Sequence, residues 1–168
     1  DILHPPASAM TGASPTPAAT AAVRRHRRGS AGGQALHRWQ QVGKLTTIHI
    51  VYELDYPISE ARLQETVQSR LLQRFPRFRG HVSEDECFWV VPDTVDARNY
   101  VKTVELTADT AGAAHDAVME RLERQMERGL PARCSWQVEI VTFNGTHNGC
   151  TLIWRVEHTV ADGVVLAQ

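Results

Sequence analysis

The chain has 168 residues, of which 42% are hydrophobic and 22% are charged, and its formal net charge at pH 7 is −1. This length and hydrophobic content are enough for one domain with a buried core. A charge balance so close to zero gives no global basic field, which argues against a nucleic-acid partner.

The three cysteines, Cys87, Cys134 and Cys150, are odd in number and widely spaced. They form no CxxC pair and no cysteine–histidine spacing typical of a metal site. We therefore expect reduced thiols in a cytoplasmic compartment, with neither a disulfide nor a bound metal. No apolar run approaches the roughly 20 residues that a membrane span requires, so we expect no transmembrane segment in this chain.

The N-terminal part, residues 1–44, is rich in Ala, Pro, Ser, Thr and Gly and has almost no periodic aliphatic pattern. Such a composition cannot bury enough apolar area to offset the entropy of ordering, so we expect a disordered or low-complexity segment. A basic run with the sequence RRHRR, residues 24–28, lies within it. Such a run can bind anionic lipid head groups or nucleic acid, although a solvated linker is its more common role.

A strand is expected to begin near Leu45, because apolar and polar residues alternate from there to residue 54. A helix follows between an N-cap at Ser59 and a stop at Pro76, with apolar residues at helical spacing at Leu63, Val67, Leu71 and Phe75. Residues 81–82 and 87–91 then read as a β-hairpin around an acidic turn.

After an irregular stretch over residues 100–106, the pattern predicts one more helix and two strands. The helix repeats apolar residues every four positions, at Ala114, Val118, Leu122 and Met126, and we expect its two methionines to fill the core. A strand around residues 136–140 turns at 144–149 into a last strand over 150–157. The order β-α-β-β-α-β-β predicts an α+β fold with a layered mixed sheet and flanking helices.

The last strand leads to the most informative residue of the chain. Period-two geometry places Arg155 and Glu157 together on one face, where they can form an ion pair. By the same alternation His158 points to the apolar side, just before an Asp162-Gly163 turn. A histidine held there in a cleft, with little freedom to move, suits a general base. The alternative is that His158 and Asp162 form a structural turn without a chemical role.

Several stretches from Leu45 to the last residue, read together, resemble the wax ester synthase/diacylglycerol acyltransferase family. They are the first strand and the leucine-rich helix ending in RFPRFR (residues 74–79), Leu130-Pro131 followed by Ser135-Trp136, and HTVADG (residues 158–163). The family belongs to a larger group of CoA-dependent acyltransferases and peptide-synthetase condensation domains. The resemblance implies one half of a chloramphenicol-acetyltransferase-like fold of two subdomains, with residues 45–168 as the N-terminal subdomain.

The resemblance also assigns roles within the HxxxDG motif. The family has two consecutive histidines before the spacer, and the second one, to which catalysis is assigned, is His158 here. Glu157 stands in the place of the first, a departure that keeps the base but removes any support the first histidine gives. Asp162 takes a structural role in locking the loop, and Gly163 allows close backbone approach as the chain enters the next helix.

The implied activity is that of an O-acyltransferase. It moves a fatty acyl group from acyl-CoA to a long-chain alcohol or diacylglycerol, so acyl-CoA is a donor substrate and no bound cofactor is implied. Such an enzyme acts in the cytoplasm, with peripheral contact to the endoplasmic reticulum, the plasma membrane or lipid droplets. Two alternatives stay open: a related acyltransferase or condensation domain with another acceptor, and a non-catalytic homologue that binds acyl-CoA or lipid.

The chain is also expected to be a fragment. It begins with Asp1, and an apolar helix start at residues 164–168 meets no stop signal. In the family the catalytic histidine lies in a channel between two halves of similar size, so the resemblance implies that the C-terminal half of the same enzyme is a missing partner. We expect the 168 residues alone to lack acyltransferase activity and to associate.

Overall fold

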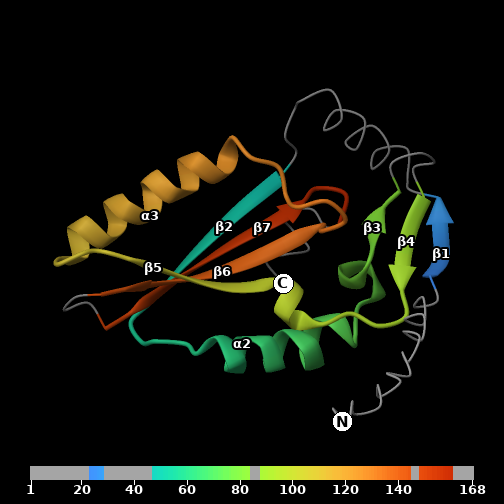
Figure 1. The fold of residues 1–168 in the computed structure, drawn as a ribbon, viewed down its shortest axis with the longest axis horizontal. Coiled ribbons are helices and arrows are strands. Elements are labelled where there is room, and N and C mark those ends of the chain that lie inside the picture. Colours follow the sequence, from blue (N-terminus) through green and yellow to red (C-terminus); the bar gives the residue numbers. More distant parts are fainter. Residues whose placement is uncertain (1–22, 29–46, 84–87, 145–147, 161–168) are drawn as a thin grey trace, which may run out of the picture.

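The fold was obtained as a computed structural model, which describes residues 23–28, 47–83, 88–144 and 148–160 (Figure 1). Its centre is a four-stranded sheet with the strand order β2-β7-β6-β5. The bounds are Thr47–Leu54 for β2, Cys150–Glu157 for β7, Trp136–Phe143 for β6 and Val101–Leu106 for β5. β7 is antiparallel to both of its neighbours, whereas β5 is parallel to β6. The sheet is therefore mixed, which confirms the predicted α+β class.

The edge strand β5 corrects one expectation, because residues 100–106 were expected to be irregular. Val101 pairs with Val138 and Leu106 with Phe143, and only Val101 is fully buried. A strand with one buried residue has a weak alternating pattern. Its pairing comes from β6, a distant segment, and such tertiary contacts override local preference.

The alternation in β6 and β7 sends side chains to two separate cores, one on each face of the sheet. On one face, Trp136, Val138, Leu152 and Val156 pack with residues of the helical segment over 60–72. On the other, Val141 and Ile153 pack with the long helix α3 (Ala111–Met126). Figure 1 shows α2 and α3 on opposite sides of the sheet. The predicted alternation over 150–157 is confirmed, and the sheet is the middle of three layers.

The first helical segment begins as α2 (Glu60–Thr66), with the Ser59 hydroxyl accepting from the Arg62 N–H at 3.3 Å, and continues as the π-helical segment η1 (Val67–Leu72). A π turn adds one residue per turn, which shifts the face that meets the sheet. The fully buried residue after Val67 is consequently Leu72, while Leu71 is only partly buried. Phe75, predicted to continue the apolar stripe, is 52% exposed for the same reason.

Helix α3 also departs from the predicted four-residue repeat at its C-terminal end. Its buried residues are Ala114, Val118, Leu122 and Gln125. The step from Leu122 to Gln125 is three residues, which follows the helical period of 3.6 more closely than a fourth step of four. Met126 therefore lies off the buried face and is 49% exposed, and Met119 is 41% exposed. The prediction that the two methionines fill the core is wrong.

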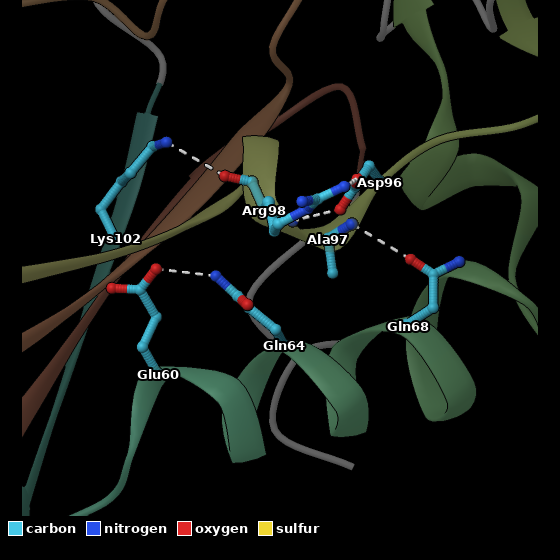
Figure 2. Close-up of polar contacts among 7 residues, drawn as sticks. All are labelled: Glu60, Gln64, Gln68, Asp96, Ala97, Arg98 and Lys102. Carbon is cyan, nitrogen blue, oxygen red and sulfur yellow. Dashed lines mark hydrogen bonds and ion pairs between the residues drawn. The ribbon is translucent and has the colours of Figure 1, made fainter.

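A short segment before β5 is tied to the first helix by polar contacts (Figure 2). The 3-10 turn η3 (Ala97–Asn99) begins at Asp96, whose carboxylate accepts from the Arg98 N–H at 2.9 Å. The Gln68 side chain of η1 accepts from the Ala97 N–H at 3.0 Å. These bonds fix the chain on the α2 side of the sheet before it enters β5.

A smaller sheet has the strand order β1-β4-β3, with β1 at Val23–Arg28, β4 at Phe88–Pro92 and β3 at His81–Val82 (Figure 1). β3 and β4 are antiparallel, as the predicted hairpin requires. β1 also pairs with β4, so disorder is not the state of Val23–Arg28. The reason is an available strand edge: β4 offers backbone partners to a segment whose own composition favours no structure. The rest of 1–44 lies outside the described residues.

The two sheets are joined through η2 (Pro76–Arg79) and the start of β6. The indole N–H of Trp136 donates to the Phe78 carbonyl at 2.7 Å, and the Ser135 hydroxyl donates to the Gly80 carbonyl at 2.7 Å. Trp136 is fully buried and stacks on Tyr100 and Trp154, with ring centroids 4.6 and 5.5 Å away. Burial, and next the Cys134 thiol, raise the pKa of Tyr100 to about 12.

Candidate active site

His158 is the first residue after β7, in a turn closed by a bond from the Val160 N–H to the Glu157 carbonyl at 2.9 Å. Its side chain is exposed, whereas Thr159 and Val160 on its C-terminal side are buried. The expectation that His158 points into an apolar cleft of this chain is therefore wrong. The strand alternation ends at Glu157, and the turn rotates the next side chain outward.

The backbone around His158 is held on both sides. The Glu157 N–H donates to the Ser135 carbonyl at 2.8 Å, and the Thr159 hydroxyl donates to the Glu157 carboxylate at 3.1 Å. Val160 is fully buried in the core on the α2 face. A side chain on such a turn has its Cα fixed while its ring stays accessible, which is the arrangement required to present a base to a ligand.

Arg155, two residues before Glu157 on β7, fixes this strand end to helix α3. It is 5% exposed, and its Nη2 donates to the Arg128 carbonyl at 2.6 Å and to the Gly129 carbonyl at 3.2 Å. These carbonyls follow the C-terminal end of α3, where backbone oxygens lack helical partners and a cation is favoured. Strand alternation alone points to Glu157 as the partner of Arg155 and does not reveal these carbonyls. The sequence carries one signal of this burial: Arg155 lies on a strand face that also carries the apolar residues Val51 and Ile153.

More buried polar groups surround Arg155 on the α3 face. Glu139 of β6 is 7% exposed and accepts from Arg121 Nε at 2.7 Å and from Gln125 Nε2 at 2.5 Å. His49 of β2 is the register partner of Arg155. Burial, and secondarily the positive charge of Arg155, lower the pKa of His49, which favours its neutral form. Burial also lowers the pKa of Arg155, an effect that the Glu139 carboxylate opposes.

Covalent catalysis finds no suitable nucleophile among the described thiols or at Ser135. Ser135 is 1% exposed and its hydroxyl is bonded to Gly80. Cys134 donates to the Trp136 carbonyl at 2.9 Å, and burial raises the pKa of its thiol, which keeps it protonated. Cys150 is buried and free of a disulfide.

The remaining predicted site residues, Asp162 and Gly163, lie outside the described residues, as does Cys87. Among the residues that are described, no group of three or more His, Cys, Asp or Glu is arranged to hold a metal ion. Within the same ranges, no helix has the length and apolar character needed to cross a membrane. Of the three predicted site residues in the HxxxDG motif, which are His158, Asp162 and Gly163, the structure therefore places His158 alone.

The layered mixed sheet is shared with the solved structures of an acyltransferase and of condensation domains. A wax ester synthase/diacylglycerol acyltransferase from Marinobacter aquaeolei VT8 matches with a TM-score of 0.61 at 14% identity, covering 84% of this chain and 36% of that chain. The first condensation domain of the CDA synthetase matches with a TM-score of 0.61 at 16% identity, covering 86% and 38%. No family model and no curated protein matches the sequence.

A third structure adds a ligand. It is the starter condensation domain of rhizomide synthetase, in a variant form in complex with C8-CoA, with a TM-score of 0.54 at 15% identity, covering 77% of this chain and 30% of that chain. The chain thus spans about a third of the length of the solved structures it matches. At these identities the likeness defines the fold, and the chemistry has to be argued from the site.

Proposed function

We propose that this chain is the N-terminal part of an acyltransferase in which His158 is the general base. The observation that carries the proposal is an exposed imidazole on a turn whose neighbouring residues are fixed by Ser135 and by the buried Val160. It is supported by a fold shared with a wax ester synthase and with condensation domains, one of them solved with C8-CoA. The proposed reaction is transfer of a fatty acyl group from acyl-CoA to a long-chain alcohol or diacylglycerol.

In this reaction His158 takes the proton of the acceptor hydroxyl as its oxygen attacks the thioester carbonyl of acyl-CoA. The tetrahedral intermediate then expels the CoA thiolate, which takes the proton back from the imidazolium, leaving an ester and free CoA. A positioned base of this kind contributes about 10²- to 10⁴-fold in rate.

Because His158 is exposed, the working enzyme needs a second surface that covers its imidazole. Acyl transfer to a lipid alcohol needs a site that excludes water and aligns two substrates. The described residues leave the imidazole open, and the solved structures that share the fold are about three times as long. We therefore assign the missing wall of the channel to a C-terminal half of the same enzyme.

The test is a His158→Ala variant of the enzyme in which this chain and its complementing half are joined. Ester formation from acyl-CoA and a long-chain alcohol should fall by about 100-fold or more, because proton transfer is removed while folding is kept. The matched control is His115→Ala, since His115 is also exposed but lies on α3 beside Glu53. Transfer above a tenth of the parental rate in a well-folded His158→Ala enzyme would contradict the assignment.

A non-catalytic homologue is the second candidate, and the observation that favours it is Glu157 in place of a histidine. The Glu157→His variant distinguishes an active acyltransferase from a non-catalytic homologue. In an active enzyme this change alters the rate, whereas a degenerate site that only binds acyl-CoA stays inactive after a single replacement. If acyl-CoA binding measured by calorimetry is unchanged in His158→Ala and in Glu157→His, and no ester forms, the chain is the non-catalytic binding protein.

A further inference from the structure

The loop between α3 and β6 carries one residue in a strained backbone conformation. The Cys134 N–H donates to the Pro131 carbonyl at 3.0 Å, which closes a turn over residues 131–134. Arg133, the third residue of this turn, has a φ of 61°, and it is the one non-glycine residue with positive φ among those that the structure describes. A turn with positive φ at its third residue alone is of type II, and that position favours Gly or Asn because a larger side chain crowds the backbone.

This loop is fixed at both ends by buried side chains. Near its start, Arg155 donates to the Arg128 carbonyl at 2.6 Å, and at its end the Ser135 hydroxyl donates to the Gly80 carbonyl at 2.7 Å. A glycine at position 133 would relieve the strain without changing the turn. The arginine side chain therefore supplies something that the turn itself does not need, and strained positions of this kind are concentrated at functional sites.

The strained residue lies near the candidate base. β6 and β7 are antiparallel, and Figure 1 shows the start of β6 beside the end of β7. The Glu157 N–H donates to the Ser135 carbonyl at 2.8 Å, so these two residues lie opposite each other where the pairing ends. One residue further, His158 follows on one side and Cys134 on the other, with Arg133 next along the loop. The side chains of Arg133 and His158 are both exposed at this end of the sheet.

The chemistry of the arginine side chain selects the kind of group that it would bind. A guanidinium presents its N–H donors in a planar fork that matches the oxygens of a phosphate or carboxylate. In the proposed reaction the acceptor, a long-chain alcohol or diacylglycerol, is uncharged, whereas the CoA part of the donor carries phosphates. These phosphates lie at the far end of the pantetheine arm from the thioester, and Arg133 likewise lies beyond the residue opposite His158.

We propose that Arg133 is a substrate-binding residue that recognises a phosphate of acyl-CoA while the thioester lies at His158. This inference rests on the proposed function, and it adds the residue by which the site selects a CoA thioester over an uncharged one. The protein gives up stability at position 133, where glycine suits the backbone better, and gains a charged hydrogen-bond donor beside the site. Such an exchange of stability for binding is common at functional positions.

The test compares acyl-CoA with the acyl-pantetheine thioester of the same chain length, which has the same reacting bond but no phosphate. The enzyme is the one in which this chain and its complementing half are joined. In Arg133→Gln the KM for acyl-CoA should rise about 10- to 100-fold with little change in kcat, because a charged hydrogen bond is lost from substrate binding. The KM for acyl-pantetheine should stay the same. Arg133→Lys, which keeps the charge but not the planar fork, should recover part of the binding.

Arg133→Gly measures the strain separately, in the 168-residue chain itself. Its urea midpoint should be higher than that of Arg133→Gln, because both variants lack the guanidinium and only glycine relieves the positive φ. In the joined enzyme it should lose acyl-CoA binding as Arg133→Gln does. Arg128→Gln is the matched control, because Arg128 is an exposed arginine of the same loop and its φ is not positive. This control should leave both KM values close to those of the parent.

Equal rises in KM for the two donors would overturn the proposal, since that is the result expected if Arg133 pairs with an acidic side chain of the complementing half. Equal effects of Arg133→Gln and Arg128→Gln would overturn it too. A joined enzyme that forms no ester contradicts the proposed function instead, and calorimetry then tests Arg133 alone. CoA should bind the parent at least about 10-fold more tightly than Arg133→Gln, and pantetheine should bind both alike. Equal CoA affinities would refute the assignment.

Discussion

The two faces of the larger sheet are both buried but are built from different chemistry. The α2 face is apolar and aromatic around Trp136, whose one polar atom is bonded to Phe78. The α3 face buries Glu139, Arg155 and Gln125 beside a small apolar cluster. Arg155 Nε and Gln125 Oε1 have no hydrogen-bond partner among the described residues. The comparison suggests that the α2 face supplies stability, while the α3 face gives up some stability to fix the strand end beside His158.

The largest effect is expected from Trp136→Ala on the α2 face. Removing a fully buried indole leaves a cavity between Tyr100 and Trp154 and deprives the Phe78 carbonyl of its donor. The free energy of unfolding should fall by about 3–5 kcal/mol. Urea denaturation followed by circular dichroism measures it, with Trp136→Phe as a milder variant. A loss below about 1 kcal/mol would mean that this face does not carry the stability.

A smaller loss, with a different readout, is expected from Arg155→Ala on the α3 face. The carbonyls of Arg128 and Gly129 lose a charged donor, which should cost about 2–3 kcal/mol. Arg124→Ala is the matched control, because Arg124 is an exposed arginine of α3 and should cost less than about 0.5 kcal/mol.

Hydrogen exchange of the Glu157 and Val160 amides separates positioning from general stability in the same variant. If Arg155 fixes the end of β7, these amides should lose protection more than amides in the middle of β6. Uniform loss across the sheet would mean that Arg155 contributes stability without positioning the His158 turn.

The smallest expected effect is a pH dependence from His49. Its pKa is lowered in the folded protein, by burial first and by Arg155 second, so the unfolded chain binds the proton more readily. The contribution of His49 to stability is then complete above the unfolded pKa of about 6.5 and is lost as pH falls toward the lowered folded value.

Urea midpoints at about pH 7.5 and about pH 5.5 test this dependence. His49→Gln should reduce the difference between them, and Arg155→Ala should reduce it in part, because one cause of the shift is removed. An unchanged pH difference in His49→Gln would contradict the assignment.

Sequence patterns predicted the elements whose residues alternate or repeat strongly. The strands over 136–140 and 150–157, the hairpin and the two helices are all present, because apolar periodicity reports burial directly. The pattern missed β5, with one fully buried residue, and β1, whose arginines gave no apolar signal. Both are formed through pairing with distant strands, which a local pattern does not contain.

The sequence names His158 as the candidate base but does not give the orientation of its side chain. The HxxxDG spacing identifies His158. Strand alternation predicts a buried side chain there, but the strand ends at Glu157 and His158 lies exposed in a turn. The α3 clamp of Arg155 was missed because its acceptors are backbone carbonyls, which any sequence supplies. The exposure of Phe75 depends on a π turn, and helical spacing does not reveal one.

The pairing of β2 with β7 has a consequence for how the protein is made. Leu54 pairs with Cys150, so β2 leaves the ribosome long before β7, its sheet neighbour among the described residues, is synthesised. At roughly 5–20 residues per second this wait is on the order of ten seconds. During that time β2 has no β7 to pair with, and the nascent chain is open to chaperones or to wrong strand partners. Closure of the sheet is therefore a late, long-range event, which makes slow folding the expected behaviour of this topology.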